Sequence, residues 1–261
     1  MLARLALIAC AFCALQPAVA AEPASDINTC RLALPTIREA WQQGAYDTSP
    51  LVAAVMVDAI DGKLARAREG LAALPSTEQQ HWRQVATVTA ANTYQSAVVD
   101  GLLDDGAAVE GRVRLPPFKS GFHDQLRDTM THDPRYGGPS AVKAVSSTDI
   151  LDGNRGSLVG PMLPMAASCR DAATLDVLLR HHANPMARSA PDAVDALTMA
   201  VINGDAALVT VLLDHGADVC EDDQHFRKPG TTLASLGRSN HLPQALVRRL
   251  TCHEPDTLTV H

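Results

Sequence analysis

Aromatic residues are scarce in this chain. They make up 3% of 261 residues, as two Trp, three Tyr and four Phe. Ligand pockets are usually lined by hydrophobic and aromatic side chains, so this composition argues against an aromatic-lined cofactor site. Alanine is abundant instead, which agrees with helices that pack closely through small residues. We therefore expect no cofactor.

Positive charge is also in deficit. The chain has 22 Lys and Arg against 29 Asp and Glu, a formal net charge of -7 at pH 7. Nucleic acid requires a basic face on the protein that binds it, so we do not expect a nucleic-acid partner. The same charge fits a basic or neutral protein partner. A long apolar run is lacking as well, because the run from Leu5 through Leu15 is too short to span a bilayer, and we expect no transmembrane segment.

Catalytic motifs are missing from the sequence. It contains no Gly-x-Ser-x-Gly elbow, no glycine-rich phosphate loop and no His-Glu-x-x-His pair. Two groups of His and acidic residues have spacings that do not place metal ligands on one helix face, and are better explained as surface residues. They are His123, His132 and Asp133, and His253, Glu254 and His261. We expect no metal and no enzymatic activity, the alternative being an enzyme whose site lies in the insertion described below.

Residues 1–20 have the layout of a secretory signal peptide. Arg4 supplies the positive charge, an apolar run follows, and Ala18-Val19-Ala20 provide the small residues before a cleavage site. This predicts export to a bacterial periplasm and a mature chain, residues 21–261, of about 240 residues. The alternative is a lipoprotein anchored through Cys10, since Leu7-Ile8-Ala9-Cys10 superficially matches a lipoprotein box. That reading leaves only nine residues for the charged and apolar regions together.

An internal repeat carries most of the information in the sequence. Leu178 to Pro185 reads LLRHHANP and Leu212 to Val219 reads LLDHGADV, with corresponding residues 34 apart. A period between about 20 and 50 residues indicates stacked supersecondary units rather than one closed core. Such arrays generally act as binding surfaces, which favours a protein partner over a catalytic pocket.

The second copy predicts a pair of helices joined by a tight turn. Leu197, Ala200 and Val201 share one face of a short helix, and Gly204-Asp205 then has the character of a turn followed by a helix N-cap. Apolar residues at three- and four-residue steps predict a second helix. Gly216 ends it, because glycine adopts the left-handed conformation without steric cost.

This unit resembles the ankyrin repeat: a small-residue helix, a glycine turn, a second helix with paired leucines, and a Gly-Ala-Asp ending. Further copies are found at 86–109, in degenerate form at 53–71, and at the end over 231–250. Tyr94 and Arg170 replace the turn glycine of the family pattern, and His182 replaces the closing glycine. No copy has the full Thr-Pro-Leu-His start of the family.

The resemblance implies an all-α fold, an ankyrin-type helix-turn-helix solenoid of four to five repeats. Repeats would occupy about 50–109 and 162–261, with a long insertion at 110–161 between the third and fourth copies. The spacing from Leu102 to Leu178 is 76, which is one period plus 42 residues. The insertion is rich in Pro and Gly turns. Loops of this length inside compact arrays are generally either functional or disordered.

Four cysteines remain after removal of the signal peptide, and they allow three connectivities. The resemblance implies that Cys220 and Cys252 lie on the same edge of the stack about one repeat apart, whereas Cys169 lies on the opposite edge. A Cys220–Cys252 disulfide is therefore our prediction. A Cys30–Cys169 bridge would require the N-terminal segment to reach the fourth unit, and we do not expect it.

The resemblance implies that a protein partner docks on the loops between repeats and on the adjacent first helices, and we expect the chain to be monomeric. In the insertion, Phe118 and Phe122 are either exposed anchors for the partner or fold the insertion back onto the repeats. Charged inter-repeat loops supply the other candidates: Arg188, Glu221, Asp222, Asp223 and His225.

Two biological roles are compatible with such a module. One is an immunity protein that occludes a toxic effector, and the other is an accessory protein that supports a periplasmic stress-defence enzyme. No residue in the sequence separates these alternatives.

Overall fold

A computed structural model describes residues 37–119, 158–188, 194–220 and 231–252. Within these ranges the regular structure is almost entirely helical, with one two-stranded sheet of two residues per strand. The predicted all-α class is therefore confirmed. No helix in the described ranges is long and apolar enough to span a membrane.

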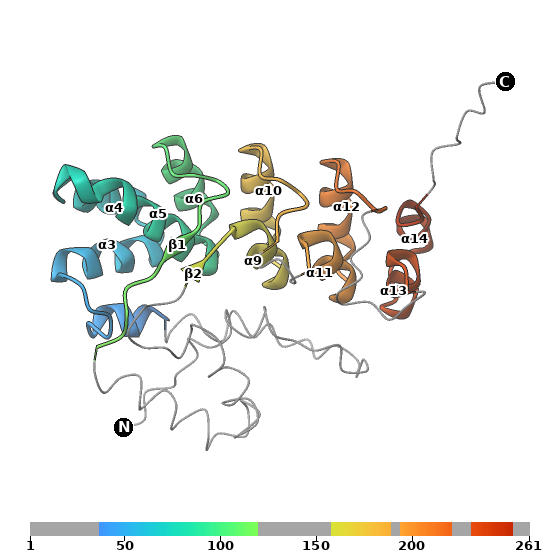
Figure 1. Cartoon of the computed structure of the whole chain (residues 1–261), viewed down its shortest axis with the longest axis horizontal. Helices are drawn as coiled ribbons and strands as arrows, with labels where there is room; N and C mark the ends of the chain where they lie inside the picture. Colours follow the sequence, from blue (N-terminus) through green and yellow to red (C-terminus); the bar gives the residue numbers. More distant parts are fainter. Residues whose placement is uncertain (1–36, 120–157, 189–193, 221–230, 253–261) are drawn as a thin grey trace, which may run out of the picture.

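The helices form pairs, which we call units 1 to 5, and they lie side by side in a row (Figure 1). First helices pack against first helices of the neighbouring units, and second helices against second helices. The pairs are α3 (Pro50–Ile60) with α4 (Leu64–Ala72), α5 (Ser76–Asn92) with α6 (Ser96–Asp104), α9 (Met162–Ser168) with α10 (Ala172–Arg180), α11 (Ala196–Ile202) with α12 (Ala206–Asp214), and α13 (Leu233–Ser239) with α14 (Gln244–Arg249). A further helical segment at 37–42 precedes unit 1.

The turn inside each unit has the same backbone conformation. Gly62, Tyr94, Arg170, Gly204 and His241 follow the first helices of units 1 to 5, and each has a φ between 54° and 74°. This left-handed region is uncommon for residues other than glycine. Tyr94 and Arg170, which replace the turn glycine of the repeat pattern, therefore keep the left-handed conformation that glycine would have.

A second left-handed residue recurs after the second helix. It is Gly106 in unit 2, His182 in unit 3 and Gly216 in unit 4, with φ values of 92°, 62° and 84°. The predicted N-cap after the turn is also confirmed, because Asp205 Oδ1 accepts a hydrogen bond from the backbone N–H of Leu208 at 3.1 Å. These local signals explain why the helix boundaries could be predicted from the sequence.

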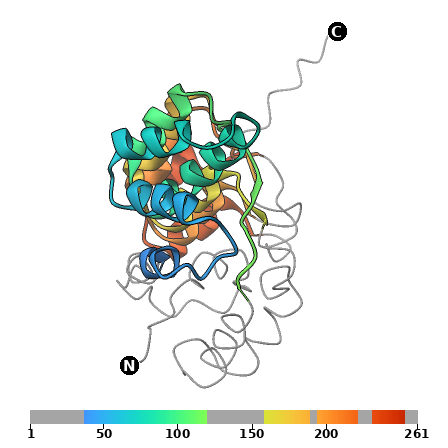
Figure 2. The same cartoon turned by 90° about the vertical axis from the view of Figure 1, so that its left-hand side faces the viewer.

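The insertion does not separate units 2 and 3. Helix α6 packs on α10 and α5 packs on α9 as in the other neighbouring units. At the base of the insertion, β1 (Val113–Arg114) pairs antiparallel with β2 (Leu158–Val159). This pairing closes the base of the insertion next to the first helices (Figures 1 and 2).

The first residues of the insertion form part of the N-terminal packing. The segment after β1 continues along the array towards unit 1 (Figure 1). There Asp47 N–H donates to the Pro117 carbonyl at 2.9 Å, and Lys119 N–H donates to the Ala45 carbonyl at 2.8 Å. The Tyr46 ring stacks on Phe118 with ring centroids 4.7 Å apart. Residues 113–119 thus connect unit 2 to the segment before unit 1.

Cys220 and Cys252 form a disulfide, with their Cα atoms 4.9 Å apart. This is the pair that the repeat resemblance implies. Cys169 is also disulfide-bonded. Our expectation on a Cys30–Cys169 bridge concerns Cys30, which lies outside the described residues.

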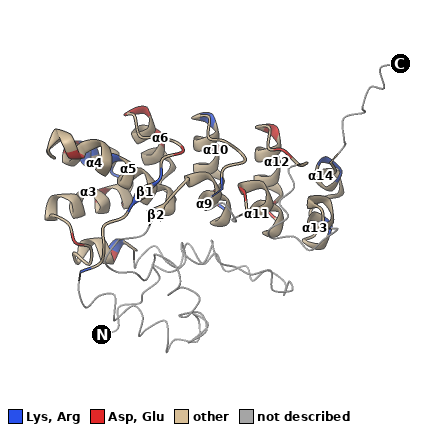
Figure 3. Cartoon of the chain, viewed as in Figure 1, with Lys and Arg blue, Asp and Glu red and all other residues tan. Residues whose placement is uncertain are grey.

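Charges of opposite sign alternate along the ends of the second helices. Figure 3 shows acidic residues at the ends of α6 and α12, and basic residues at the ends of α10 and α14. Ion pairs of 2.6 to 3.6 Å join units 1 and 2, units 2 and 3, and units 4 and 5. The pairs are Arg68 with Asp105, Arg180 with Asp100, and Arg249 with Asp214. Each exposed pair contributes little to stability, but like charges in adjacent units are avoided.

Candidate functional site

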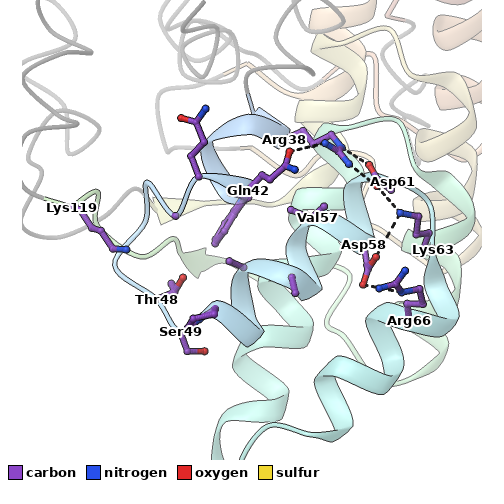
Figure 4. A pocket seen from close by; sticks show the side chains of 16 residues that line it. Arg38, Gln42, Thr48, Ser49, Val57, Asp58, Asp61, Lys63, Arg66 and Lys119 are labelled. Atoms are coloured by element: carbon purple, nitrogen blue, oxygen red, sulfur yellow. Dashed lines mark hydrogen bonds and ion pairs between the residues drawn. The ribbon is translucent and has the colours of Figure 1, made fainter. Parts of the chain in front are cut away.

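A hollow of about 530 Å³ opens at the N-terminal end of the array. It lies between the helical segment 37–42, helix α3, the start of α4 and the end of segment 113–119 (Figure 4). Apolar lining residues include Trp41, Ala53, Ala54 and Val57. Charged residues surround this apolar part, so the hollow combines a non-polar surface with a charged rim.

Local sequence signals position the wall formed by α3. Ser49 is the N-cap of the helix, and its Oγ accepts a hydrogen bond from Val52 N–H at 3.2 Å. Pro50 occupies the first helical position, where its missing N–H leaves no donor unsatisfied. Val52, Val55, Met56, Ala59 and Ile60 bury the opposite face. The helix therefore presents Ala53, Ala54 and Val57 to the hollow while its other side is fixed in the core.

A stack of three aromatic rings holds the other walls together. Trp41 stacks on Tyr46 with ring centroids 4.0 Å apart, and Tyr46 stacks on Phe118. Trp41 and Tyr46 are 2% and 3% exposed. Because the three residues come from the 37–42 helix, the following turn and the insertion, the stack fixes the backbone next to Lys119 relative to the 37–42 helix.

Asp61 is the centre of the electrostatic network on one side of the hollow. Its carboxylate accepts two hydrogen bonds from Arg38, at 2.6 and 3.0 Å, and one from Lys63 at 2.8 Å. These bonds, first that from Arg38 and then that from Lys63, hold the pKa of Asp61 well below its usual range. The same carboxylate raises the pKa of Arg38. The network ties the 37–42 helix to the end of α3.

The remaining charges leave an excess of positive charge. Arg66 and Lys63 lie 3.5 and 3.8 Å from the Asp58 carboxylate. Lys119 projects from the opposite side of the hollow (Figure 4), and its ammonium group has no carboxylate partner among the described residues. Four cationic and two anionic side chains thus occur among the described lining residues. Such a site is suited to bind a carboxylate or another anion, with apolar contacts beside it.

Within the described part of the chain, no group of three or more His, Cys, Asp or Glu residues is placed to hold one metal ion. The two groups considered in the sequence, at 123–133 and 253–261, lie outside the described residues.

Two of the predicted partner-binding residues are described, and both contribute to internal contacts. Phe118 is half-buried in the aromatic stack and packs on the core, so it takes the packing role of our two alternatives. Arg188 is half-buried, and its carbonyl accepts a hydrogen bond from Arg112 Nη2 at 2.8 Å. It also forms an isolated β-bridge with Asp195, which joins the two ends of the loop between units 3 and 4. Phe118 directly precedes Lys119 of the hollow's charged rim, whereas Arg188 is not among the residues that line the hollow.

The other predicted site residues lie outside the described ranges. They are Phe122, Glu221, Asp222, Asp223 and His225. A partner-binding role for them stays a prediction.

The residues of the hollow were missed by the sequence reasoning. Arg38, Asp61, Arg66 and Lys119 have no common motif and come from separate segments. The only local signal near the site is Ser49-Pro50, which predicts a helix start but no ligand.

Comparison with known proteins gives no family for this chain: no family model matches its sequence, and no curated protein matches it significantly. The repeat pattern and the geometry of the hollow are therefore the basis for a functional proposal.

Proposed function

We propose that this chain is an exported, ankyrin-type protein-binding module of the bacterial periplasm that has no catalytic activity of its own. The observation that carries the proposal is the recurrence of one helix pair along the array. Each unit has a left-handed residue between its helices, and neighbouring units pack first helix on first helix and second on second. This arrangement supports the ankyrin resemblance, whose copies were located from the sequence alone.

An array of this kind presents a long surface made of equivalent positions. Residues 181–188 follow α10 and residues 215–220 follow α12 at the same position in their units, and β1 and β2 hold the base of the insertion next to the first helices (Figure 1). We expect the partner to contact these loops together with the first helices. The net charge of -7 favours a partner that is basic or neutral overall, because unlike net charges speed association.

Capture of the partner from native periplasmic extract tests the proposal. The bait is the full exported chain, and a second bait has residues 120–157 replaced by a flexible linker. Residues 113–119 and 158–161 must be retained, because Phe118 and Lys119 contact the segment before unit 1. Arg114 pairs with Leu158, and residue 119 lies five residues beyond Arg114. At about 3.3 Å per residue, the linker must therefore span about 16 Å from residue 119 back to Leu158. About ten Gly and Ser residues provide that reach.

The expected result is a stoichiometric partner that binds the full chain and then re-binds it in purified form. Loss of the partner with the second bait would place the contact in the insertion, and retention would place it on the helix pairs and their loops. If neither bait recovers a stoichiometric partner, the binding proposal is wrong.

A further inference from the structure

We propose that the hollow at the N-terminal end of the array is a docking site for a short acidic peptide segment of the partner protein. The inference rests on the proposed protein-binding function and adds the location and chemistry of one contact. It is carried by the excess of positive charge in the hollow, by the fixed position of the walls that carry this charge, and by the apolar surface next to it.

The charge of the hollow is opposite to that of the chain. Its described lining has two more cationic than anionic side chains, whereas the whole chain has a formal net charge of -7. Long-range attraction follows the net charge, but contact energies follow the charges within a few ångströms, because salt screens interactions beyond about 8 Å. A partner that is basic overall can therefore dock an acidic segment here.

Arg66 and Lys119 of this hollow differ from Arg68 and Arg249. Arg68 and Arg249 are each held by a carboxylate of a neighbouring unit at 2.6 Å. Lys119 has no such partner among the described residues, and Arg66 has only a 3.5 Å contact with Asp58 while 68% of its side chain is exposed. The hollow therefore offers cations that an incoming carboxylate can pair with, whereas Arg68 and Arg249 are already paired.

The backbone of Lys119 and the paired cations of the opposite wall are held in position before any ligand binds. Lys119 follows Phe118 in the aromatic stack, and its backbone N–H is bonded to Ala45. Arg38 and Lys63 are fixed by Asp61 and form the opposite wall. Fixing side chains in the free protein lowers the entropy cost of binding. The fixed wall also leaves Arg66 and Lys119 as the groups most available to a ligand.

The apolar part of the hollow selects a peptide over a simple anion. Ala53, Ala54 and Val57 line it on α3, and small side chains leave room for the backbone and methyl groups of a segment such as Glu-Ala-Glu. The volume of about 530 Å³ lies in the range of specific ligand sites. A free phosphate or a nucleic acid would use the cations but not this surface.

Binding of a defined peptide tests the proposal. The probe is acetyl-Glu-Ala-Glu-Ala-Glu-amide, titrated into the full chain purified from the periplasm, with the Gln-Ala-Gln-Ala-Gln peptide as the uncharged control. The test variant is Lys119→Glu with Arg66→Glu, since neither side chain has a structural partner that the fold requires. The matched control is Arg238→Glu with Arg248→Glu, which changes the net charge equally but lies in unit 5. Methyl NMR shifts of Ala53 and Ala54 locate the bound peptide.

We expect the acidic peptide to bind wild type and the unit 5 control equally, and to bind the hollow variant at least fivefold more weakly. The methyl shifts of Ala53 and Ala54 should move in the first two proteins only. Equal affinity of all three proteins, equal binding of the Gln peptide, or equal binding of an oligothymidylate would each overturn the assignment. If the hollow variant still captures the partner of the full chain at full strength, the protein-binding function stands and this docking site is wrong.

Discussion

The Tyr94 hydroxyl donates a hydrogen bond to the Cys169 carbonyl at 2.7 Å, across 75 residues of sequence and the whole insertion. Cys169 is the C-cap of the first helix in unit 3. The same relation recurs one unit later, where Arg170 Nη2 donates to the carbonyl of Asn203, the C-cap of α11, at 2.9 Å. In both cases the residue that replaces the turn glycine bonds to the next unit. The hydrogen bond offsets the cost of a left-handed conformation in a residue with a Cβ atom.

Tyr94→Phe should lower the free energy of unfolding by about 1 kcal/mol. The ring and its backbone conformation are kept, so the change removes only the hydroxyl and leaves the Cys169 carbonyl without this donor. Urea unfolding followed by circular dichroism measures the difference. An unchanged midpoint and slope would show that the bond between units 2 and 3 makes no net contribution.

Gly204→Ala should destabilise the protein more than Gly216→Ala. Both glycines have positive φ, at 64° and 84°, so each alanine suffers a backbone strain of about 1 kcal/mol. A Cβ at Gly204 would also lie 2.8 Å from the Asn240 carbonyl oxygen, whereas a Cβ at Gly216 meets nothing within 4 Å. Gly216→Ala is thus the control that isolates the strain. Equal losses for both variants, measured by urea unfolding, would contradict the close approach of units 4 and 5.

Replacing Cys220 and Cys252 together by Ser should destabilise unit 5 before the rest of the array. The bridge closes a loop with a sequence separation of 32. For a loop of this length, the lower entropy of the unfolded chain predicts a stabilisation of about 3–4 kcal/mol. Amide hydrogen exchange of α13 and α14 should quicken, because each unit of an array contacts only its neighbours. The double variant is preferable to a reducing agent, since Cys169 is also disulfide-bonded. Unchanged exchange in α13 and α14 would show that packing on unit 4 alone holds them.

Asp61→Asn should remove part of the acid sensitivity of folding. The folded-state pKa of Asp61 is depressed by Arg38 and Lys63, so its stabilising effect is complete above the unfolded pKa of about 3.9 and is lost as pH falls below that value. Arg38 is 40% exposed, and we expect a difference of at most about 1 kcal/mol at pH 7. Unfolding free energies at pH 7, 5, 4 and 3 measure it. A difference in unfolding free energy between wild type and variant that stays constant down to pH 3 would contradict the depressed pKa of Asp61.

Asp214→Asn is the matched control for that experiment. Asp214 also pairs with an arginine at 2.6 Å, but its side chain is 57% exposed. We expect the change there to have a smaller effect on unfolding than Asp61→Asn. A larger effect would show that the end of α12 depends on Arg249 more than its exposure suggests.

Much of the helical architecture was predictable because its signals are local. Apolar spacing, the Asp205 N-cap and the left-handed positions at Gly204 and Gly216 depend on residues a few positions apart. The same reasoning located units in which Tyr94 and Arg170 replace glycine. The Cys220–Cys252 pair was also predictable, because the repeat pattern places the two cysteines about one repeat apart on the same edge of the stack.

The candidate site was not predictable in this way. Arg38, Asp61 and Lys119 become neighbours of one hollow only after the insertion returns to unit 1. Phe118 was considered as an exposed anchor, yet it stacks on Tyr46, 72 positions earlier in the chain. Sequence spacing has no information on such a contact, because the path of an irregular segment is set by what it packs against.

By itself the sequence determined the repeating helix pair, its turns and the place where the array is interrupted, because each depends on backbone preferences and side-chain periodicity over a few residues. Only the tertiary structure decided that residues 113–119 close the N-terminal end, that Cys169 has a disulfide partner, and that an excess of cationic side chains meets there in one hollow. Those outcomes depend on long-range packing and on which charges are left unmatched once distant segments come together.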